Sequence, residues 1–383
     1  GGGVEPGTSL PDNLIRELHE ETGLTVDVGP LVLVNEFHDP ASGFHQVDLF
    51  FRTTLRAGSI DPAWIDPEGV VTRRRFFAPD ELAVVGGDHE LAQRFSQLPF
   101  DHLLFTGSTA VGRHVMRAAA ENLTPVTLEL GGKSPAIIAP DYPMAKAAAR
   151  IIAGKCLNAG QTCIAPDYVM LPAGQEESFI AAARAIVAAS YPNLAENPDY
   201  SAIVNARHAI RLRNYLTDAA AKGARIIPLA EVPNHNTGPQ RLAPTLVLQP
   251  DDSMLIMQEE IFGPLLPVMI YQRIEDALNY INAHDRPLAL YLFDHDQTRI
   301  EQVLNNTVAG GVTINDTILH IAQDNLPFGG VGSSGMGHYH GYEGFLTFSK
   351  LKPVFYQSRI NGMGLFNPPY GKLFERLLKV LLR

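Results

Sequence analysis

The stretch Asn158-Ala159-Gly160-Gln161-Thr162-Cys163 follows a helix-like run over residues 144–157 and carries a potential nucleophile. Asn158 and Gly160 are residue types that end helices and turn chains, so we expect Cys163 on a loop just past a helix. A thiolate there could attack a carbonyl carbon, although a free thiol with a pKa of about 8.5 forms little thiolate at neutral pH. Taken alone, a single cysteine is more often an inert buried thiol. The other motifs of the chain decide between these two interpretations.

Length and composition indicate a globular protein of more than one domain. The chain has 383 residues, more than one hydrophobic core usually holds, and its 45% hydrophobic content is typical of globular proteins. The formal net charge of −11 argues against binding nucleic acid by phosphate neutralisation. The two cysteines, Cys156 and Cys163, provide no disulfide framework and suit a reducing cytoplasm, where we expect the protein. No apolar run approaches the ~18 residues that would span a bilayer.

A helix is predicted from Ser9 to Gly23, and one of its faces is acidic. Glu17, Glu20 and Glu21 recur at i, i+3 and i+4, so their carboxylates share one face. Hard cations such as Mg²⁺ prefer such oxygen ligands and hold phosphates beside them. Three glutamates alone are more often a solvated acidic surface, so the pattern needs support from its neighbours.

The residues around these glutamates are more specific. Residues 2–24, with Arg16-Glu17-Leu18-His19-Glu20-Glu21-Thr22-Gly23-Leu24, resemble the Nudix box. The resemblance implies a Mg²⁺-dependent hydrolase of nucleoside diphosphates joined to another group. It places the three glutamates at the metal and Arg16 as the partner that orients one of them. Residues 31–37 and 47–55 are expected to be strands, and residues 76–82 are similar to a Nudix tail.

This Nudix-like segment, residues 1–82, departs from the family pattern. Thr8 stands where the family has a glutamate, and the strands that normally precede the box are not in this sequence. A sheet without its first strands exposes unpaired edges and loses part of its core. The chain opens Gly1-Gly2-Gly3 with neither a start methionine nor a secretory signal, which suggests a fragment of a longer reading frame.

Beyond residue 83 the sequence predicts alternating strands and helices. A strand, a glycine turn and a helix are expected over residues 103–105, 106–112 and 113–121. Such a helix N-terminus can hold a phosphate, but Arg113-His114 excludes a Walker loop. Glu129 ends a further strand, residues 126–130, beside glycines, where a carboxylate can face a cleft. A single glutamate in such a place is more often a surface charge.

The later part of the chain continues this α/β pattern. Helices are expected over residues 176–190, 205–223, 274–281 and 298–304, and strands over residues 243–248, 265–271, 288–293 and 310–315. Residues 330–335 match G-x-G-x-x-G, but no strand leads into them and no acidic residue follows ~20 positions later. We interpret them as a glycine loop and not as a dinucleotide fingerprint.

Five motifs occur in the order found in aldehyde dehydrogenases, and the resemblance spans nearly all of residues 83–356. They are Phe105-Thr106-Gly107-Ser108, Glu129-Leu130-Gly131-Gly132-Lys133, Gly160-Gln161-Thr162-Cys163, Glu260-Ile261-Phe262-Gly263-Pro264 and Pro327-Phe328-Gly329-Gly330. Residues 123–128 and 163–168, together with Asn315-Asp316 and His320, are similar to the class 3 and coniferyl aldehyde dehydrogenase branch.

The resemblance implies a role for each matched residue. Cys163 would attack an aldehyde carbon, and Glu129 would act as general base for the water that releases the acid. Hydride would pass to NAD⁺ or NADP⁺, with the backbone N–H of Cys163 holding the oxyanion. Cofactor contacts would come from Gly107, Ser108, Glu260 and Phe262, and Asn315 and His320 would line the substrate pocket. Cys156 is interpreted as a packing residue.

One part of the family pattern does not occur in this chain. Aldehyde dehydrogenases carry a long segment before the Phe-Thr-Gly-Ser strand, with most of the nucleotide-binding sheet, a lysine for the adenosine ribose and an asparagine for the oxyanion. Losing one oxyanion donor typically costs about 3 kcal/mol of transition-state stabilisation. The expected domains are therefore a truncated Nudix-like segment (1–82), a remnant of the NAD(P)-binding domain (83–130), a catalytic domain (131–345), and an oligomerisation strand with a tail (346–383).

The last residues predict an amphipathic helix. Lys372, Arg376, Lys379 and Arg383 fall on one helical face, and leucines occupy the other. A membrane-surface helix fits this pattern, although docking on its own domain or on a second subunit is the favoured interpretation. The resemblance implies a homodimer that pairs through a strand near residues 346–355.

We therefore expect an α/β fold in which a catalytic domain adjoins a partial Rossmann-like sheet, preceded by a partial Nudix-like α/β unit. The leading function is oxidation of an aldehyde, aromatic or aliphatic, to the acid with NAD(P)⁺. The alternatives are a Mg²⁺-dependent Nudix hydrolase and a catalytically incompetent chimera of the two. The sequence leaves the aldehyde and the choice between NAD⁺ and NADP⁺ open.

Overall fold

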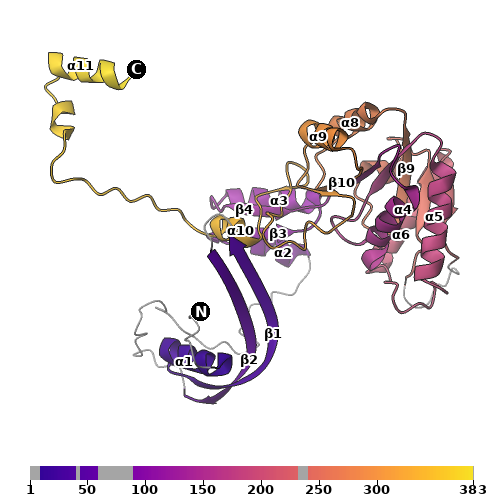
Figure 1. Cartoon of the computed structure of the whole chain (residues 1–383), viewed down its shortest axis with the longest axis horizontal. Helices are drawn as coiled ribbons and strands as arrows, with labels where there is room; N and C mark the ends of the chain where they lie inside the picture. The colour runs from indigo at the N-terminus through magenta and orange to yellow at the C-terminus, as the bar shows by residue number, and fades with distance from the viewer. Residues whose placement is uncertain (1–8, 40–43, 59–88, 232–239, 383) are drawn as a thin grey trace. The chain divides into compact units, whose positions relative to one another are not determined.

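The computed structural model describes residues 9–39, 44–58, 89–231 and 240–382, which divide into two compact units, Gly1–Thr347 and Phe348–Arg383 (Figure 1). The expected junction near Leu82 and the expected Nudix tail at residues 76–82 lie outside the described residues. The domain boundaries at residues 82, 130 and 345 stay predictions.

A seven-stranded sheet forms the centre of the first unit. Its strand order is β11-β10-β5-β6-β9-β8-β7, and every neighbouring pair is parallel except β7 with β8. The strands are β5 (Pro135–Ile138), β6 (Tyr168–Pro172), β7 (Arg225–Pro228), β8 (Thr245–Leu248), β9 (Leu265–Tyr271), β10 (Ala289–Phe293) and β11 (Gly311–Ile314). Strands β5, β6, β8 and β10 are buried along their whole length. Their near-continuous apolar sequences follow from helices covering both faces of a parallel sheet.

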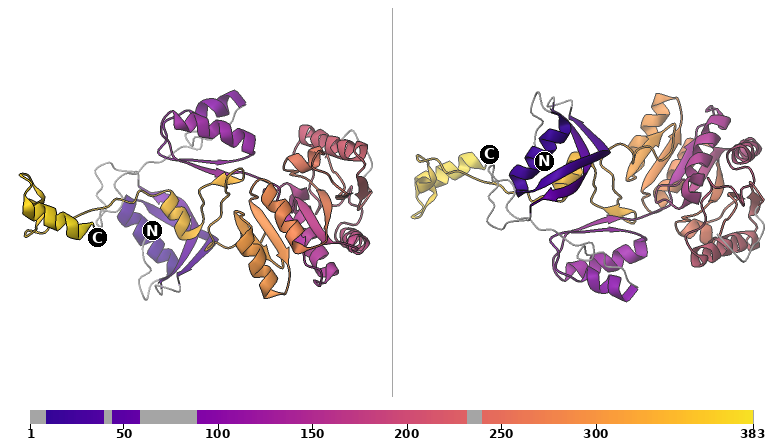
Figure 2. Two further views of the ribbon diagram at one scale, coloured as in Figure 1. Left: turned by 90° about the horizontal axis from the view of Figure 1, so that it is seen from above. Right: turned by 90° about the horizontal axis from the view of Figure 1, so that it is seen from below.

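Two hydrophobic clusters fill the space between the sheet and its helices. The larger holds the apolar faces of α4 (Met144–Cys156), α5 (Glu176–Ser190) and α6 (Ala206–Ala221). The smaller holds those of α8 (Ile274–Ala283) and α9 (Gln297–Asn306). Figures 1 and 2 show the two helix groups on opposite faces of the sheet. Alternate residues of β10 enter different clusters, as the pleat of a strand requires.

A second, smaller sheet contributes one side of a cleft in the first unit. Its order is β12-β4-β3, with β3 (Leu103–Thr106) parallel to β4 (Val126–Glu129) and β12 (Gly335–Met336) antiparallel to β4. Helix α3 (Thr109–Ala120) follows β3, and Leu103, Val115, Leu128 and Leu130 form the core between them. Helices α2 (His89–Ser96) and α10 (Gly341–Thr347) also belong to the first unit. This small sheet lies within the part of the chain where a remnant of a nucleotide-binding sheet is expected, and that role stays a prediction.

Most expected elements agree with the structure within a few residues. Helix α5 and strand β9 match their expected spans, whereas α3 begins four residues earlier because the Ser108 side chain accepts a hydrogen bond from Val111 N. At the N-terminus, α1 (Leu10–Thr22) begins after Ser9 and ends at Gly23, which has a φ of 74°. The antiparallel strands β1 (Thr25–Asp39) and β2 (Phe44–Ala57) are longer than predicted.

The expected oligomerisation strand at residues 346–355 is not a strand in the described chain. Thr347 ends α10, and residues 348–355 have neither helix nor strand geometry. An edge segment becomes a strand only when a neighbour supplies hydrogen bonds, and this single chain offers none there. The second unit then contains the short 3₁₀ helix Met363–Phe366 and α11 (Lys372–Leu381), which carries no buried residue.

Helix α11 confirms the predicted amphipathic tail helix. Lys372, Arg376 and Lys379 share one face, and Leu373 and Leu381 are exposed on the other side. Arg383 lies outside the described residues. Within the described ranges, no helix is both long enough and apolar enough to cross a membrane.

Candidate active site

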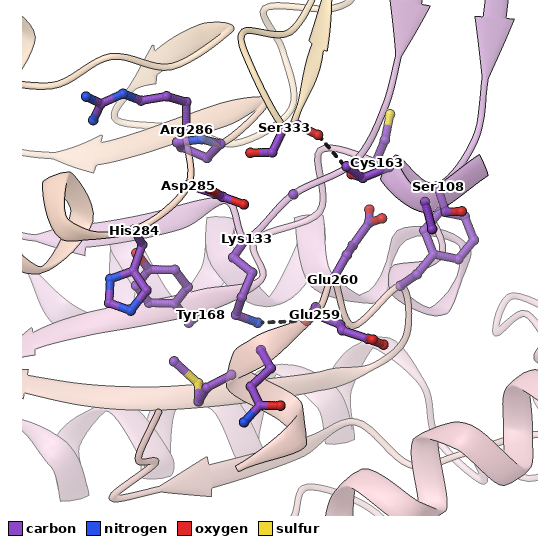
Figure 3. Close-up of a pocket in the computed structure, with 18 of the residues that line it drawn as sticks. Ser108, Lys133, Cys163, Tyr168, Glu259, Glu260, His284, Asp285, Arg286 and Ser333 are labelled. Carbon is purple, nitrogen blue, oxygen red and sulfur yellow. Dashed lines mark hydrogen bonds between the residues drawn. The ribbon is translucent and has the colours of Figure 1, made fainter. Parts of the chain in front are cut away.

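A cleft of about 1090 Å³ opens between the seven-stranded and the three-stranded sheet. One side comes from the β3–α3 turn and the end of β4, and the other from the segment after α7 (Leu255–Gln258) and the end of α8. Cys163, Ser108, Glu260 and Lys133 are labelled around it in Figure 3. Glu129, Gly107 and Phe262 also line it. The structure therefore brings all six expected catalytic and cofactor residues of this part of the chain to one cleft.

The loop before Cys163 contains three consecutive residues with left-handed backbone conformation. Helix α4 ends at Cys156, and Asn158, Ala159 and Gly160 have φ values of 49°, 53° and 73°. A Cβ on Gly160 would lie 2.3 Å from the carbonyl oxygen of Gly263, so only glycine allows this contact. These residues turn the chain sharply and bring it against the segment that follows Glu260.

Hydrogen bonds from distant residues fix the loop on both sides of the cysteine. The Gln161 amide donates to Asn158 O and Ala202 O, both at 3.0 Å, and its oxygen accepts from Val204 N at 2.8 Å. Beyond the cysteine, the Tyr291 hydroxyl donates to Ile164 O. Cys163 is half-buried in a loop that hydrogen bonds attach to two other parts of the domain, residues 202–204 and Tyr291.

The surroundings of the Cys163 thiol favour its protonated form. Burial raises the pKa of this thiol to about 11, with the Glu260 and Glu129 carboxylates adding to the increase and the backbone N–H groups of Cys163 and Ile164 opposing it. A carboxylate that binds a proton would remove one of the opposing charges. Formation of the thiolate therefore depends on the protonation of its two glutamate neighbours.

Glu129 is the last residue of β4 and only 4% exposed, so the interpretation as a surface charge is wrong. Neither of its carboxylate oxygens has a hydrogen-bond partner among the described residues. Burial raises the pKa of Glu129 to about 8. A carboxyl group with a pKa near neutrality can both accept and release a proton during a reaction.

Glu260 approaches the backbone of the opposite wall very closely. A Cβ at Gly131 would lie 1.9 Å from Glu260 Oε2, so the glycine makes room for this carboxylate. Burial raises the pKa of Glu260 to about 8, with Asp167 adding to the increase and Lys155, Arg211 and Lys133 opposing it. Two residues along the chain, Phe262 lines the same cleft with a φ of 47°.

Three charged residues that the sequence analysis assigned no role hold the Glu260 segment in place. Arg211 donates to Glu260 O at 3.1 Å and to Ile261 O at 2.7 Å. Asp167 accepts from Ile261 N at 3.0 Å and forms an ion pair with Lys133 at 2.5 Å. Lys133 and Asp167 each lie inside a stretch that resembles the family, and this could have marked them as site residues. Nothing in the local sequence distinguishes Arg211 in this way.

The β3–α3 turn presents a helix N-terminus to the cleft. Ser108 caps α3, and Gly107 N donates to Glu129 O at 3.0 Å, which ties the turn to the end of β4. A Cβ on Gly107 would lie 2.5 Å from the ring of Phe105. Free backbone N–H groups at this end of a helix favour an anion such as a phosphate.

Asn315 and His320, the two predicted pocket residues, do not line this cleft. The Asn315 side chain accepts from Asp294 N at 2.9 Å and donates to Asp294 O at 2.8 Å. His320 is buried with Nδ1 at 2.9 Å from Thr313 Oγ1, and burial lowers its pKa to about 4. Their assignment to a substrate pocket stays a prediction.

The Nudix-like helix α1 carries the three predicted metal ligands. Arg16 pairs with Glu20 at 2.7 Å, as expected for a partner that orients this glutamate. The side chains of Glu17 and Glu21 lie outside what the structure describes. Over the described residues, no group of three or more histidine, cysteine or carboxylate side chains is placed to hold a metal ion.

The fold and the cleft together define an α/β protein whose cleft is lined by a half-buried cysteine and by the N-terminal end of a helix. The family model for the aldehyde dehydrogenase family matches residues 78–354, and the model for the NUDIX domain matches residues 1–98. The chain belongs to the aldehyde dehydrogenase family. The two matches overlap at residues 78–98, so the sequence joins a Nudix-like beginning to an aldehyde dehydrogenase remainder.

Two curated relatives place the chain within this family. It is 58% identical over 306 residues to a probable coniferyl aldehyde dehydrogenase of Pseudomonas aeruginosa, and this alignment covers 79% of this chain and 63% of the relative. It is 53% identical over 312 residues to the coniferyl aldehyde dehydrogenase of Pseudomonas sp. strain HR199, and this alignment covers 80% of this chain and 65% of the relative. The chain thus spans a little under two thirds of the length of these two relatives.

Solved structures show the same fold. Substrate-bound Staphylococcus aureus AldH matches with a TM-score of 0.71 and 40% identity, over 78% of this chain and 64% of that one. A Mycobacterium tuberculosis aldehyde dehydrogenase complexed with NAD⁺ matches with a TM-score of 0.64 and 32% identity, over 71% and 57%. The expected α/β class with a large parallel sheet is confirmed.

Proposed function

We propose that this chain oxidises an aldehyde to the carboxylic acid with NAD⁺ or NADP⁺ through a thioester on Cys163. The observation that carries the proposal is the convergence of Cys163, Glu129 and Glu260 on one cleft although they come from three separate parts of the chain. The names of the two Pseudomonas relatives favour coniferyl aldehyde, an aromatic aldehyde, as the first substrate to test.

The cleft fits a dinucleotide by its size and its polar groups. Glu260 Oε1 is buried and has no hydrogen-bond partner in the described part of the chain, which suits a carboxylate that accepts hydrogen bonds from ribose hydroxyls. Gly107 and Ser108 at the start of α3 would hold the diphosphate, and Phe262 would pack against the nicotinamide. When bound, the oxidised nicotinamide supplies an acceptor for the hydride that leaves the substrate carbon.

The chain's own residues perform the remaining chemistry. The Cys163 sulfur forms a bond to the aldehyde carbon after its proton has left, and the backbone N–H of Cys163 donates to the developing oxyanion. After oxidation, the acyl group is held as a thioester on the same sulfur. Glu129 then takes a proton from a water molecule, whose oxygen attacks the acyl carbon and releases the acid and the thiol. The half-buried position of the sulfur leaves an approach for both partners.

A direct assay tests this function. The protein is incubated with coniferyl aldehyde or an aliphatic aldehyde and with NAD⁺ or NADP⁺, and formation of the reduced cofactor is followed by its fluorescence. We expect reduced cofactor and the matching acid in equal amounts. Absence of product with every pair of aldehyde and cofactor, from a chain that circular dichroism shows to be folded, would contradict the proposal.

A second candidate function rests on the NUDIX match and on the Arg16–Glu20 ion pair of α1. We propose Mg²⁺-dependent cleavage of a nucleoside diphosphate derivative by the Nudix-like segment. Turnover should need Mg²⁺ and should disappear in Glu20→Gln, while Glu343→Gln in α10, far along the chain, serves as the matched control. Turnover that persists in Glu20→Gln, or that does not need Mg²⁺, would contradict this candidate.

We also propose a cytoplasmic homodimer. An exposed apolar run supports pairing near residues 346–355: Phe348, Leu351, Val354 and Phe355 are 52%, 72%, 60% and 83% exposed. A monomeric mass in sedimentation equilibrium at micromolar concentration would contradict the dimer.

A further inference from the structure

The second unit, residues 348–383, differs in charge from the rest of the chain. It contains one acidic residue, Glu375, and seven basic residues: Lys350, Lys352, Arg359, Lys372, Arg376, Lys379 and Arg383. Its net charge is therefore +6, whereas the whole chain carries −11 and residues 1–347 carry −17. A basic segment of this kind is attracted to anionic surfaces that the rest of the chain repels.

Helix α11 separates its charged side chains from its apolar ones. At about 3.6 residues per turn, the charged side chains of residues 372–379 share an arc of about 100°. The apolar side chains share the wider remaining arc, and they are Leu373, Phe374, Leu377, Leu378, Val380 and Leu381. Lysine and arginine on one face with leucine and phenylalanine on the other are typical of a helix that lies in the interface of a bilayer.

The apolar face of α11 is open to solvent. Leu373, Val380 and Leu381 are 57%, 74% and 67% exposed, and no residue of the helix is buried. The ring of Tyr370 packs on that of Phe374 with 4.5 Å between centroids, which places an amphipathic aromatic residue at the start of the helix. Because a helix of only ten residues is marginal in water by itself, this face needs a surface to bind.

The cations of α11 are available to an external partner. In the described part of the chain, Lys372, Arg376 and Lys379 form no ion pair, although Glu375 lies four residues before Lys379. Three unpaired cations beside an exposed apolar face match the two layers of an anionic bilayer, which are the phosphates at its surface and the acyl chains beneath them.

We propose that α11 lies flat in the headgroup layer of a membrane that contains anionic phospholipids. Its leucines lie among the acyl chains, and its cations contact the lipid phosphates. A lipid surface satisfies both faces of the helix at once, whereas α11 of a second copy brings the same basic arc and repels it. This contact does not depend on aldehyde oxidation, and a peripheral contact is compatible with the proposed cytoplasmic location.

Flotation of the full chain with lipid vesicles tests the contact. The protein is mixed with vesicles of phosphatidylcholine alone or with about 30% phosphatidylglycerol, and the bound fraction is measured at increasing lipid concentration. We expect at least about tenfold tighter binding to the anionic vesicles, and weaker binding as salt rises from about 0.05 M to about 0.5 M. Equal binding to both kinds of vesicle, or binding to neither, would overturn the proposal.

The basic arc is tested by reversing its charge. Arg376→Glu combined with Lys379→Glu should weaken binding to the anionic vesicles by about tenfold or more. The matched control, Lys146→Glu combined with Arg184→Glu, makes the same change of charge at exposed residues of α4 and α5 and should bind as the wild type does. Equal losses in the two double variants would show that only the total charge of the protein matters, which would overturn the proposal.

The apolar face is tested separately. Leu381→Ser should weaken binding about tenfold, because one leucine side chain no longer enters the acyl layer. Leu304→Ser, at a 42% exposed leucine of α9, should have no effect. Since no residue of α11 is buried, changes in this helix leave the hydrophobic clusters of the first unit intact, and circular dichroism checks this. Unchanged binding of Leu381→Ser would overturn the proposal.

Fluorescence shows which face of the helix enters the lipid. The chain has one tryptophan, Trp64, so the unchanged protein supplies the background. On addition of anionic vesicles, Leu381→Trp should shift its emission to shorter wavelength, and Lys379→Trp should shift much less. Equal shifts, or none in either variant, would overturn the proposal. Tail variants that lose a dimer in sedimentation equilibrium, while the wild type binds no vesicles, would instead assign α11 to a contact between copies.

Discussion

Cys163→Ser is expected to lower the rate of aldehyde oxidation by about a thousandfold or more. A serine hydroxyl at this position is a much weaker nucleophile, because its pKa is far above that of a thiol and the two nearby carboxylates oppose a further negative charge. The loop should keep its shape, since the Gln161 and Tyr291 hydrogen bonds do not involve the sulfur. Reduced-cofactor formation and acyl-enzyme mass after acid quenching provide the measurement.

Cys156→Ser is the matched control for this prediction. Cys156 belongs to the large hydrophobic cluster and is 3% exposed, and burial raises its pKa to about 12. We expect the control to lose some stability, because a hydroxyl replaces a buried thiol, but to keep its activity. Cys163→Ser with a tenth or more of the wild-type rate, or a folded Cys156→Ser without activity, would show that the nucleophile has been assigned to the wrong residue.

Glu129→Gln is expected to separate the two halves of the reaction. Without the carboxylate, water attack on the thioester should slow by about a hundred- to ten-thousandfold, whereas formation of the thioester needs no base at this position. A rapid-mixing experiment should then show one equivalent of reduced cofactor per active site, followed by very slow turnover. Glu121→Gln, an exposed glutamate at the end of α3, should behave as wild type.

The pH dependence of the wild-type protein follows from the same residue. Burial raises the pKa of Glu129 to about 8, so its basic form increases as pH rises through that value. Where release of the acid limits turnover, the steady-state rate should increase between about pH 7 and pH 9 and then level off. Glu129→Gln should lack this increase. A burst with the same pH-dependent slow phase in the variant would show that another group activates the water.

The sequence was most informative where one local motif determines one local structure. The helix ahead of Cys163 and the strand that ends at Glu129 follow from short runs of residues, whereas α3 begins four residues before its expected start because Ser108 caps it. Only the family resemblance predicted that Cys163 and Glu129 lie in one cleft, because periodicity along a chain does not show which strand ends come together. The burial of Glu129 depends on that meeting, which is why the local reading as a surface charge was wrong.

The hydrogen bonds that hold the Glu260 segment in place could not be predicted from local sequence patterns, because they join residues that are far apart in the chain. Lys133 bonds to Ile256 O, and Arg211 bonds to Glu260 O and Ile261 O, across sequence separations that no local pattern encodes. The expected strand at residues 346–355 needs hydrogen bonds from outside one chain, so a sequence pattern alone could not produce it here. The Asn315 side chain bonds to the backbone of Asp294, a contact that no local pattern indicates, and its place in a substrate pocket stays a prediction.

The contact between Gly160 and Gly263 also orders events during synthesis. Roughly a hundred residues separate these glycines, so a ribosome making ~5–20 residues each second needs several seconds to deliver the second after the first. Until then the left-handed turn at Asn158 and Ala159 lacks its packing contact with Gly263, and the Cys163 sulfur lacks the neighbours that this later segment supplies. A nascent chain that is arrested between the two glycines should therefore carry an ordinary thiol, and the raised pKa of Cys163 should arrive only with the later segment.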